Sequence, residues 1–274
     1  MYNTDWHIHS TASYDAKLPV PVLIESAKRS GIEMFGITDH ANYNIPSYWE
    51  NMKESKRLYE QYKTDGFYFG VELTTIPKAM YEHCAKTGTR DGYACTIPIE
   101  GYEFEFMMTA EEMKELGIMY AVAAAHSPWH TDVSQGNGLI KEWHRQQMYI
   151  ATDPRVDILG HPWWFYYQDQ APWFQDFDII PRSMHDDLAA ALIENGVCIE
   201  ANAYMVYGER SSVDFYRKYN EYLRYMFEKG VKMTFGSDCH GPKYKDSRED
   251  MQKALEAVGF KKGDFTIPRI RKQG

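Results

Sequence analysis

The residues that could carry chemistry in this sequence are histidines and carboxylates that recur in short motifs along the chain. Six of the ten histidines lie in such motifs, and each motif closes an apolar run with the length of a β-strand. The motifs are DWHIHS, FGITDH, AAAHSP, ILGHPW and FGSDCH, and a glutamate closes a further run in YFGVELTT. Imidazole nitrogens and carboxylate oxygens are common ligands of transition-metal ions. Their repetition at strand ends indicates one metal centre built from several strands.

A spacing of two residues places side chains on the same face of a strand. His7 and His9 have this spacing, so we expect both imidazoles to grip one metal ion. Asp238 and His240 have it as well. Cys239 lies between them and should point away from the site, so it is not assigned as a ligand.

Three further candidates come from the strand ends and loops between these two pairs. Glu72 closes the third strand, and its two oxygens could bridge two cations, which a neutral imidazole cannot do. Asp15 lies in the loop after the first strand, where it could bind metal or form a turn. His40 is the better ligand of the TDH motif because adjacent strand residues point to opposite faces. Asp39 is then left to support a ligating imidazole.

The remaining strand ends supply two more ligands and a supporting acid. His126 and His161 are the first strongly polar residues after two buried runs, and we expect both to bind metal. Glu200, in IEAN, is expected to support a ligand rather than bind an ion itself. His130 follows the AAAHSP motif and is a candidate proton donor or substrate contact. Three histidines are given no part in the site: His83, His144 and His185.

Apolar, strand-like runs alternate with amphipathic, helix-like stretches along the whole chain. Strict alternation of strand and helix favours parallel βαβ units. Seven such units can be counted, including a less regular one after the third strand. The predicted strands span residues 4–9, 33–38, 67–73, 118–126, 156–161, 197–202 and 232–238, and the predicted helices span residues 19–31, 47–63, 138–151, 182–196, 211–230 and 248–259.

The fold class that fits this pattern is an α/β barrel forming a single domain over residues 1–274. The predicted strands are nearly continuous apolar runs, as expected when both faces of a sheet are covered. Ligand candidates follow almost every strand, at the end where barrel active sites are built. A doubly wound open sheet is the alternative, but it would gather ligands at one switch point. An excursion over about residues 74–115 is expected to be a functional loop or an added hairpin.

Composition limits the classes of function that the chain could have. Of its 274 residues, 44% are hydrophobic and 15% aromatic, which suits a folded domain with a sizeable core. The net charge of −9 argues against binding nucleic acid through its phosphates. No signal peptide or membrane-spanning run is recognisable, and four cysteines without a CxxC pair suit a reducing cytoplasm. We therefore expect a cytoplasmic protein that does not bind nucleic acid or span a membrane.

Taken in order, the motifs resemble the PHP (polymerase and histidinol phosphatase) family of metal-dependent phosphoesterases. The resemblance extends from His7 to His240 and depends on HIH, TDH, a strand-end glutamate, two single histidines and SDCH. It implies a distorted (β/α)7 barrel that holds two or three divalent ions of zinc, iron or manganese. It also implies three ligand sets: first His7, His9, Glu72 and Asp238, second Glu72, His126 and His161, and third Asp15, His40 and His240.

The reaction that this resemblance implies is hydrolysis of a small phosphomonoester by a hydroxide that bridges metal ions. The cations lower the pKa of bound water, hold the phosphate in line and neutralise charge on the phosphoryl oxygens. Glu72 would bridge the ions. The leaving group would take its proton from His130, or from a water held by Asp15 or His240. Two residues are candidates for contact with the phosphate: Arg210 and Ser127.

Histidinol phosphate is the best single substrate for this interpretation, because the chain length suits stand-alone histidinol phosphatases. A nucleotide or another small phosphoester is nearly as well supported. A metal-dependent amidohydrolase is one alternative, although its barrel typically has eight units and a bridging residue after the fourth strand. A nuclease acting on nucleic-acid ends is another alternative, and the negative net charge argues against it. A non-catalytic metal-binding module would be expected to have lost ligands.

Overall fold

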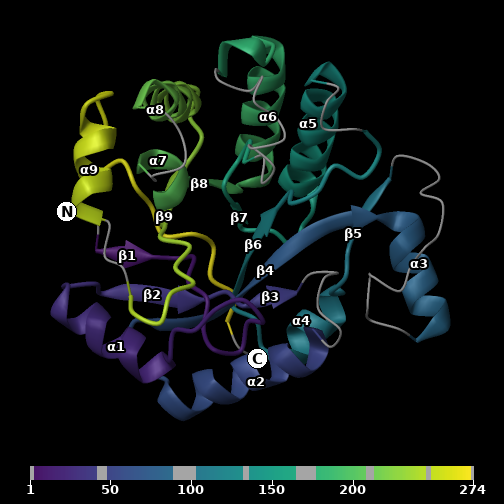
Figure 1. The fold of residues 1–274 in the computed structure, drawn as a ribbon, viewed down its shortest axis with the longest axis vertical. Coiled ribbons are helices and arrows are strands. Elements are labelled where there is room, and N and C mark those ends of the chain that lie inside the picture. Colours follow the sequence, from purple (N-terminus) through teal and green to yellow (C-terminus); the bar gives the residue numbers. More distant parts are fainter. Residues whose placement is uncertain are drawn as a thin grey trace.

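The structure, a computed structural model, describes residues 3–41, 48–88, 103–131, 136–164, 177–207, 213–244 and 248–272. Its centre is a sheet of parallel strands surrounded by helices (Figure 1). The strands lie side by side in the order β1, β2, β4, β6, β7, β8 and β9, which is also their order in the sequence. Their bounds are β1 Thr4–Asp5, β2 Met34–Ile37, β4 Phe67–Pro77, β6 Tyr120–Ala124, β7 Ile158–Leu159, β8 Cys198–Asn202 and β9 Met233–Gly236.

The first and last strands of this sheet, β1 and β9, come together and nearly close a barrel. Trp6 N donates a hydrogen bond to Phe235 O at 3.0 Å, and Asp238 N donates one to His7 O at 2.7 Å. The predicted seven-stranded α/β barrel is confirmed. Because the strands are parallel, their carboxyl ends all open at the same rim, where the candidate ligands follow them.

Helices cover the outside of the barrel, as Figure 1 shows. Proline at N1 or N2 begins α1, and α6 ends at Gly196, whose φ of 67° is left-handed and suits glycine. No helix in the described part of the chain is both long and apolar enough to cross a bilayer. The helices are α1 Val20–Arg29, α2 Tyr48–Tyr62, α5 Gly136–Thr152, α6 Arg182–Asn195, α7 Ala203–Tyr207, α8 Val213–Glu228 and α9 Arg248–Glu256, with a 3-10 turn, η2, at Phe177–Ile179.

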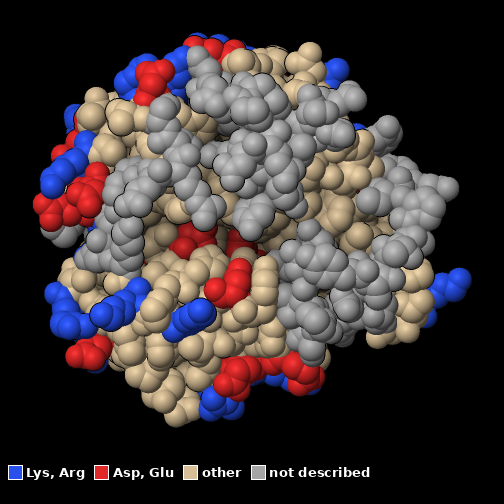
Figure 2. Space-filling model, in the orientation of Figure 1, with Lys and Arg blue, Asp and Glu red and all other residues tan. Residues whose placement is uncertain are grey.

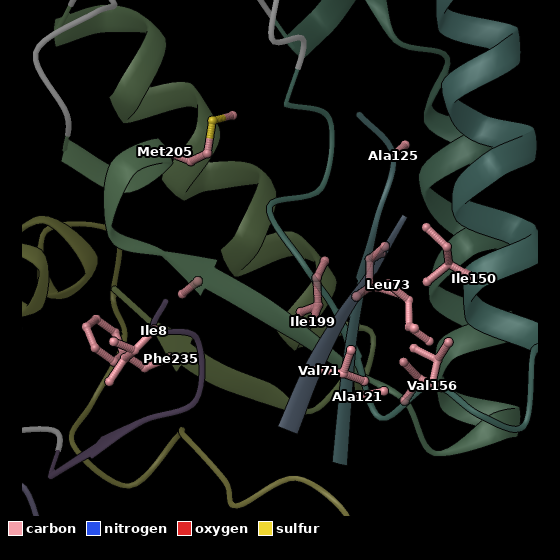
Figure 3. Packing of buried hydrophobic residues seen from close by; sticks show 14 of the residues in the cluster. Ile8, Val71, Leu73, Ala121, Ala125, Ile150, Val156, Ile199, Met205 and Phe235 are labelled. Atoms are coloured by element: carbon pink, nitrogen blue, oxygen red, sulfur yellow. The ribbon is translucent and has the colours of Figure 1, made fainter. Parts of the chain in front are cut away.

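Alternate residues of each strand face the barrel interior and the surrounding helices. On β4, Val71 and Leu73 pack outward in the main core beside Ile150 of α5 (Figure 3). On β6, Tyr120 turns inward and packs against Trp6 in a smaller, separate cluster. This alternation directs residue 72, between Val71 and Leu73, into the barrel.

The barrel interior is filled by Tyr120, and two glycines leave the space for its ring. A Cβ atom on Gly36 would lie 2.2 Å from the Tyr120 hydroxyl, and one on Gly70 would lie 2.6 Å from the ring. The hydroxyl donates to Trp6 O at 3.0 Å and is therefore satisfied although it is buried. These residues make the barrel a packed core rather than a pore.

The excursion after the third strand contains an added hairpin. β4 continues to Pro77, and its end pairs antiparallel with β5, Phe104–Phe106. Between them lies the helix α3, Lys78–Thr87, which the sequence analysis did not predict; residues 89–102 lie outside the described part. The helix after the hairpin is α4, Ala110–Leu116, and Thr109 and Glu112 form a capping box at its start.

The C-terminal segment closes the end of the barrel opposite the candidate ligands. Thr266 N donates to Met233 O at 2.8 Å, and Arg271 N donates to Met119 O at 2.7 Å, both near the amino ends of strands. Around the face drawn in Figure 2, lysines and arginines are scattered among acidic side chains, and acidic side chains lie in a hollow near its centre. The described residues of that face therefore give no support to a nucleic-acid partner.

Candidate metal centre

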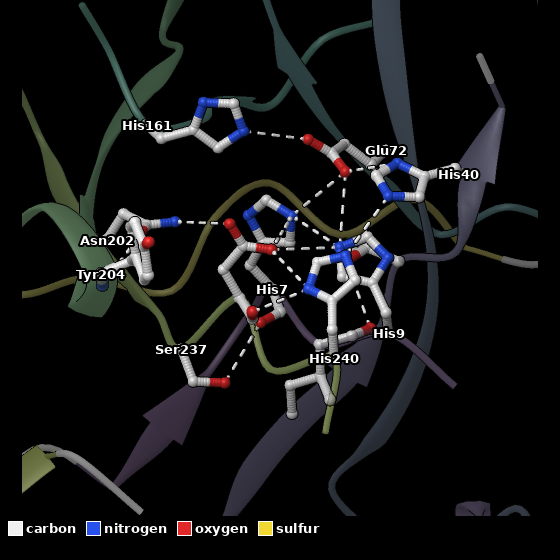
Figure 4. Close-up of polar contacts among 12 residues, drawn as sticks. His7, His9, His40, Glu72, His161, Asn202, Tyr204, Ser237 and His240 are labelled. Carbon is white, nitrogen blue, oxygen red and sulfur yellow. Dashed lines mark hydrogen bonds and ion pairs between the residues drawn. The ribbon is translucent and has the colours of Figure 1, made fainter. Parts of the chain in front are cut away.

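The candidate ligands meet at the carboxyl end of the barrel (Figure 4). Glu72 lies at the centre, 1% exposed, and points inward from β4. Each of the other eight residues that the sequence analysis proposed as ligands lies within 4.0 Å of Glu72 or of a residue that contacts it: His7, His9, Asp15, His40, His126, His161, Asp238 and His240.

The two carboxylate oxygens of Glu72 face different groups of imidazoles. Oε1 lies 3.1 Å from His161 Nε2 and 3.2 Å from His126 Nε2. Oε2 lies 2.8 Å from His40 Nδ1 and 3.4 Å from His7 Nε2. This is the arrangement required of a carboxylate that bridges two cations.

His7 and His9 present their Nε2 atoms to the same point, as their spacing predicts. The two nitrogens are 3.1 Å apart. Asp238 Oδ1 completes this group at 3.4 Å from His7 Nε2 and 3.2 Å from His9 Nε2. Two imidazoles and a carboxylate that converge in this way form a mixed nitrogen and oxygen donor set.

A further group lies towards the outside of the barrel mouth. His40 Nε2 and His240 Nε2 are 3.4 Å apart, and Asp15 Oδ2 lies 3.4 Å and 3.6 Å from these two nitrogens. The His9 ring stacks against both imidazoles, with centroids 4.3 Å from His40 and 4.0 Å from His240. His9 thus contacts the inner and outer groups, whereas the family resemblance assigns it to the inner set alone.

Three groups of these side chains each bring one ligand atom per residue within 4.8 Å of one another. They are His7, His9 and Glu72; Glu72, His126 and His161; and His9, His40 and His240. Two buried donor atoms without a hydrogen bond also fit a divalent cation. Glu72 Oε2 and His40 Nδ1 are both buried and close, yet they form no hydrogen bond with each other or with another described atom. A cation bound between such atoms would satisfy them.

The backbone is strained at several of these positions. His161, Trp163 and Asp238 have positive φ angles of 20°, 61° and 53°, although none of them is glycine. Non-glycine residues adopt such angles rarely, and those that do concentrate at functional sites. The turn after β7 is held by side chains: Gln147 Oε1 accepts from Trp163 N at 3.2 Å.

Buried polar residues hold the candidate ligands in place. Glu200 Oε1 lies 2.8 Å from His7 Nδ1, the contact expected of an acid that supports a candidate ligand. Thr74 Oγ1 lies 3.0 Å from His126 Nδ1, and Ser13 Oγ lies 3.3 Å from His9 Nδ1. The sequence analysis did not single out Thr74 or Ser13. The only signal for Thr74 was its place two residues after Glu72, on the same face of β4.

Asp39 does not hold a ligating imidazole, and that expectation is corrected. Its carboxylate accepts hydrogen bonds from Ser10 N at 2.6 Å and from the hydroxyls of Ser10 and Ser55 at 2.7 Å and 2.5 Å. Asp39 therefore ties the loop after His9 to α2. The pleat directs Asp39 away from His40, as predicted, and that same direction carries it away from the imidazoles.

Burial and neighbouring charges together raise the pKa of one imidazole of the centre, His40, and lower that of another, His9. Burial alone would lower the pKa of His40, but the carboxylates of Glu72 and Asp15 outweigh burial and raise it to about 10. For His9, burial and the cationic forms of His240 and His40 all act to lower the pKa, which lies well below its ordinary value.

The acids are held in their charged form. Burial would raise the pKa of Glu72, but His40 and His7 lower it well below its usual range. Burial also opposes the charged form of Asp238, and His7 again holds its pKa well below normal. The site therefore offers anionic oxygen ligands at neutral pH, which are the form that binds metal ions.

Exposure changes steadily across the centre. Glu72 is 1% exposed, whereas Asp15 is 34% and His240 is 32% exposed. Asp15 and His240 therefore form the more exposed side of the centre.

His130 and Ser127 have described contacts outside the group of candidate ligands. The His130 ring packs edge-on to Phe104 of the hairpin, with centroids 5.6 Å apart, and lies 3.5 Å from the Glu142 carboxylate. Ser127 is buried, and its carbonyl oxygen accepts from Gln146 Nε2 at 3.0 Å. Arg210 lies outside the described residues. The helical histidines lie outside the centre: His144 stacks on Trp163, His185 is buried against Tyr222, and His83 belongs to α3.

Comparisons with known proteins agree with this geometry. The family model described as "PHP domain" matches residues 5–260 of the chain. A protein of Acetivibrio thermocellus named "Probable phosphatase" is 27% identical over 236 residues, which cover 86% of this chain and 78% of that protein. A shorter match, 32% identical over 74 residues, joins 27% of this chain to 28% of a "Probable histidinol-phosphatase" of Thermotoga maritima.

A solved structure shares the fold. It is the histidinol phosphate phosphatase of Lactococcus lactis subsp. lactis, complexed with zinc, L-histidinol and phosphate. The TM-score is 0.61 at 14% sequence identity, and the alignment covers 94% of each chain. At this identity the likeness concerns the arrangement of strands and helices alone.

Proposed function

Because this chain belongs to the PHP domain family, we propose that it is a metal-dependent phosphatase that hydrolyses a small phosphomonoester. The observation that carries the proposal is the placement of Glu72. Its two oxygens lie among separate groups of imidazoles at the open end of a barrel. A shared carboxylate can hold two neighbouring cations, and two such cations can stabilise the attacking and leaving oxygens of an in-line displacement at phosphorus.

Residues in different parts of the centre would hold different ions. His7, His9 and Asp238 would hold one ion, His126 and His161 would hold a second, and Glu72 would belong to both. When bound, zinc, iron or manganese ions would activate a water for attack and neutralise charge on the phosphoryl oxygens. The outer residues would hold a third ion: Asp15, His40 and His240.

Proton transfer to the leaving group is assigned to the exposed side of the centre. Asp15 and His240 are the most exposed candidate ligands, so a departing alcohol would leave past them. His130 remains a second candidate. Its contacts with Phe104 and Glu142 are the reason for ranking it below a water held by Asp15 or His240.

The substrate proposed is histidinol phosphate or a phosphomonoester of similar size, such as a nucleotide. The position of Trp164 favours a substrate that carries a flat organic group. Its ring lies edge-on to His161 and His126, with ring centroids 4.8 Å and 6.1 Å away. The centroid of the Tyr204 ring lies 6.4 Å from that of Trp164. Arg210 and Ser127 are proposed to contact the phosphate.

A phosphatase screen with added metals tests the proposal. The protein would be loaded with manganese, zinc or iron and offered histidinol phosphate, mononucleotides, bisphosphates and a chromogenic monoester. We expect phosphate release from at least one of them, with none after chelation of the metal. Hydrolysis of an amide or a nucleic-acid end, with no turnover of any phosphomonoester under the same conditions, would refute it.

A further inference from the structure

The geometry points to Glu200 as a positioning residue that links two of the proposed metal sites. The binding geometry of each site therefore depends on that of the other. This inference rests on the proposed function, because it concerns the metals that the phosphatase would use. Glu200 is 1% exposed and lies on β8 behind the candidate ligands. It is not itself one of the residues that converge as ligands.

Each oxygen of Glu200 contacts a different site. Oε1 lies 2.8 Å from Nδ1 of His7, which belongs to the group with His9. Oε2 accepts from the backbone N–H of His161 at 2.7 Å, and His161 belongs to the group with His126. Glu72 joins these same two groups directly, so Glu200 forms a second connection between them.

The contact with His7 selects a tautomer. When Oε1 accepts a hydrogen bond from the protonated Nδ1, the lone pair of His7 lies on Nε2, the atom that faces His9, Glu72 and Asp238. A carboxylate behind a ligating imidazole fixes the ring and raises its basicity in this way.

The contact with His161 holds a strained turn. The φ of His161 is 20°, a value that few non-glycine residues adopt. Its N–H is buried and is satisfied by Glu200 Oε2, so the backbone strain is offset at the point where it arises. Without this acceptor, relaxation of the turn would carry the His161 ring away from Glu72.

The fold reserves space for this acid. A Cβ atom on Gly236 of β9 would lie 1.8 Å from Glu200 Oε1 and 2.6 Å from His7 Cβ. Asn202 donates from Nδ2 to Glu200 Oε2 and to Asp238 Oδ2, both at 3.2 Å. Glu200 therefore accepts from the described neighbours at both oxygens and has one allowed position.

A glutamine at position 200 separates the two contacts. Glutamine keeps the size of the side chain but offers one acceptor and one donor. If its oxygen faces His7, its amide nitrogen meets the N–H of His161. If its nitrogen faces His7, the imidazole must accept at Nδ1 and carry its proton on Nε2, where the metal should bind. Either orientation damages one of the two sites.

The test is a titration of the metal-free full chain with Co²⁺, followed by its visible absorption and by calorimetry, for wild type, Glu200→Gln and Asp157→Asn. Asp157 is the matched control, because it is also buried and accepts a backbone N–H, from Ala121 at 2.9 Å, but it lies at the opposite end of the barrel. We expect half-saturation of Glu200→Gln to need about 10–100-fold more free Co²⁺ than wild type. Asp157→Asn should titrate like wild type.

A measurement on the wild type keeps the inference testable if Glu200→Gln does not fold. Nitrogen-15 NMR of the zinc-loaded protein should show His7 protonated at Nδ1. A proton on Nε2 of His7, or equal Co²⁺ titrations for wild type and Glu200→Gln, would overturn the role of Glu200. A wild type that binds no divalent ion would overturn the proposed phosphatase itself, so the two failures are distinct.

Discussion

At the scale of single residues, Glu72 carries more of the proposed chemistry than any other side chain. Its two oxygens face imidazoles from strands on both sides of β4, and no described neighbour could replace both contacts at once. A histidine at this position would offer one lone pair, and an aspartate would be one methylene shorter. The position therefore requires glutamate, whereas several surrounding ligands could exchange nitrogen for oxygen.

Glu72→Gln should abolish phosphatase activity while leaving the fold intact. Glutamine keeps the shape but cannot bridge cations as an anion, so we expect a loss of at least about 100-fold in kcat/KM and a lower metal content. Steady-state kinetics and elemental analysis after metal-replete purification measure both. Glu105→Gln, which alters an acid of the hairpin, is the control. Survival of activity in Glu72→Gln would refute the bridging role.

The raised pKa of His40 gives the metal-free protein a defined dependence on pH. The folded value of about 10 lies above the ordinary value of 6.5, so the proton on His40 stabilises the fold below about pH 6.5. This stability should be lost as pH rises towards 10. Urea unfolding of the metal-free protein should show the decline, and His40→Gln should reduce it. A stability that rises over this range would contradict the assignment.

The same proton links pH to metal binding. An imidazole must be neutral to bind a cation, so binding at neutral pH should release protons and become tighter as pH rises. Calorimetry in buffers with different ionisation enthalpies counts the protons. His144→Gln, which changes a histidine outside the centre, should release the same number as wild type. Proton release that is unchanged in His40→Gln would show that another group supplies it.

At the scale of elements, the sequence predicts the strands and their ends well, because both depend on short-range patterns. Apolar runs of strand length ending in a histidine or an acid mark the barrel and eight of its nine candidate ligands directly. Asp15 is the exception, since it lies in a loop, yet it too reaches the centre. The missed helix α3 lies in the excursion, where no regular strand–helix alternation guides the assignment.

What the sequence could not predict depends on contacts between elements. The position of His9 between the inner and outer groups depends on stacking with His40 and His240, which come from distant parts of the chain. The carboxylate of Asp39 accepts a hydrogen bond from Ser55 of α2, a contact between separate elements that neither motif reveals. Whether His130 turns towards the centre or the hairpin was likewise not encoded in its own motif, because Phe104 and Glu142 decide it.

The packing of Tyr120 against Gly36 predicts that substitutions at these two positions have coupled effects on the free energy of unfolding. Gly36→Ala should lower the free energy of unfolding by about 1–3 kcal/mol, because the new methyl group overlaps the Tyr120 hydroxyl. Tyr120→Phe should cost less stability in the Gly36→Ala background than in wild type, since it removes the overlapping atom. Denaturant unfolding of the two single variants and the double variant measures the coupling. Strict additivity would contradict the packing.

At the scale of the whole molecule, stability and chemistry lie at opposite ends of the barrel. Asp157 is buried near the amino ends of the strands, where it pairs with Arg269 at 2.6 Å and Arg271 at 2.5 Å. Burial raises the pKa of Asp157, and the arginines of the C-terminal segment act against that rise. The C-terminal segment therefore supplies the basic partners of the buried Asp157 carboxylate.

Arg271→Ala should lower the free energy of unfolding by about 1–3 kcal/mol, because it removes one of the two arginines that pair with the buried Asp157 carboxylate. Metal content and kcat per folded molecule should stay at the wild-type level. Urea unfolding, elemental analysis and kinetics on one preparation separate the two effects. Arg271→Lys, which keeps the charge, should lose less stability. A changed metal content in Arg271→Ala would mean that the two ends of the barrel are not independent.

The closure of the barrel by its first and last strands sets the order of events during synthesis. His7 and His9 emerge from the ribosome early, but Asp238 and His240 arrive only with β9; Asp5 and Ser237, which bond across this closure, are 232 residues apart. At ordinary rates of translation that interval lasts roughly 10–50 s. The outer group and the Asp238 contact cannot exist before it has passed. A chain that stops before β9 would lack the strand that closes the barrel and two of the proposed ligands, Asp238 and His240, so the full set of proposed metal sites would form only after β9 has been made.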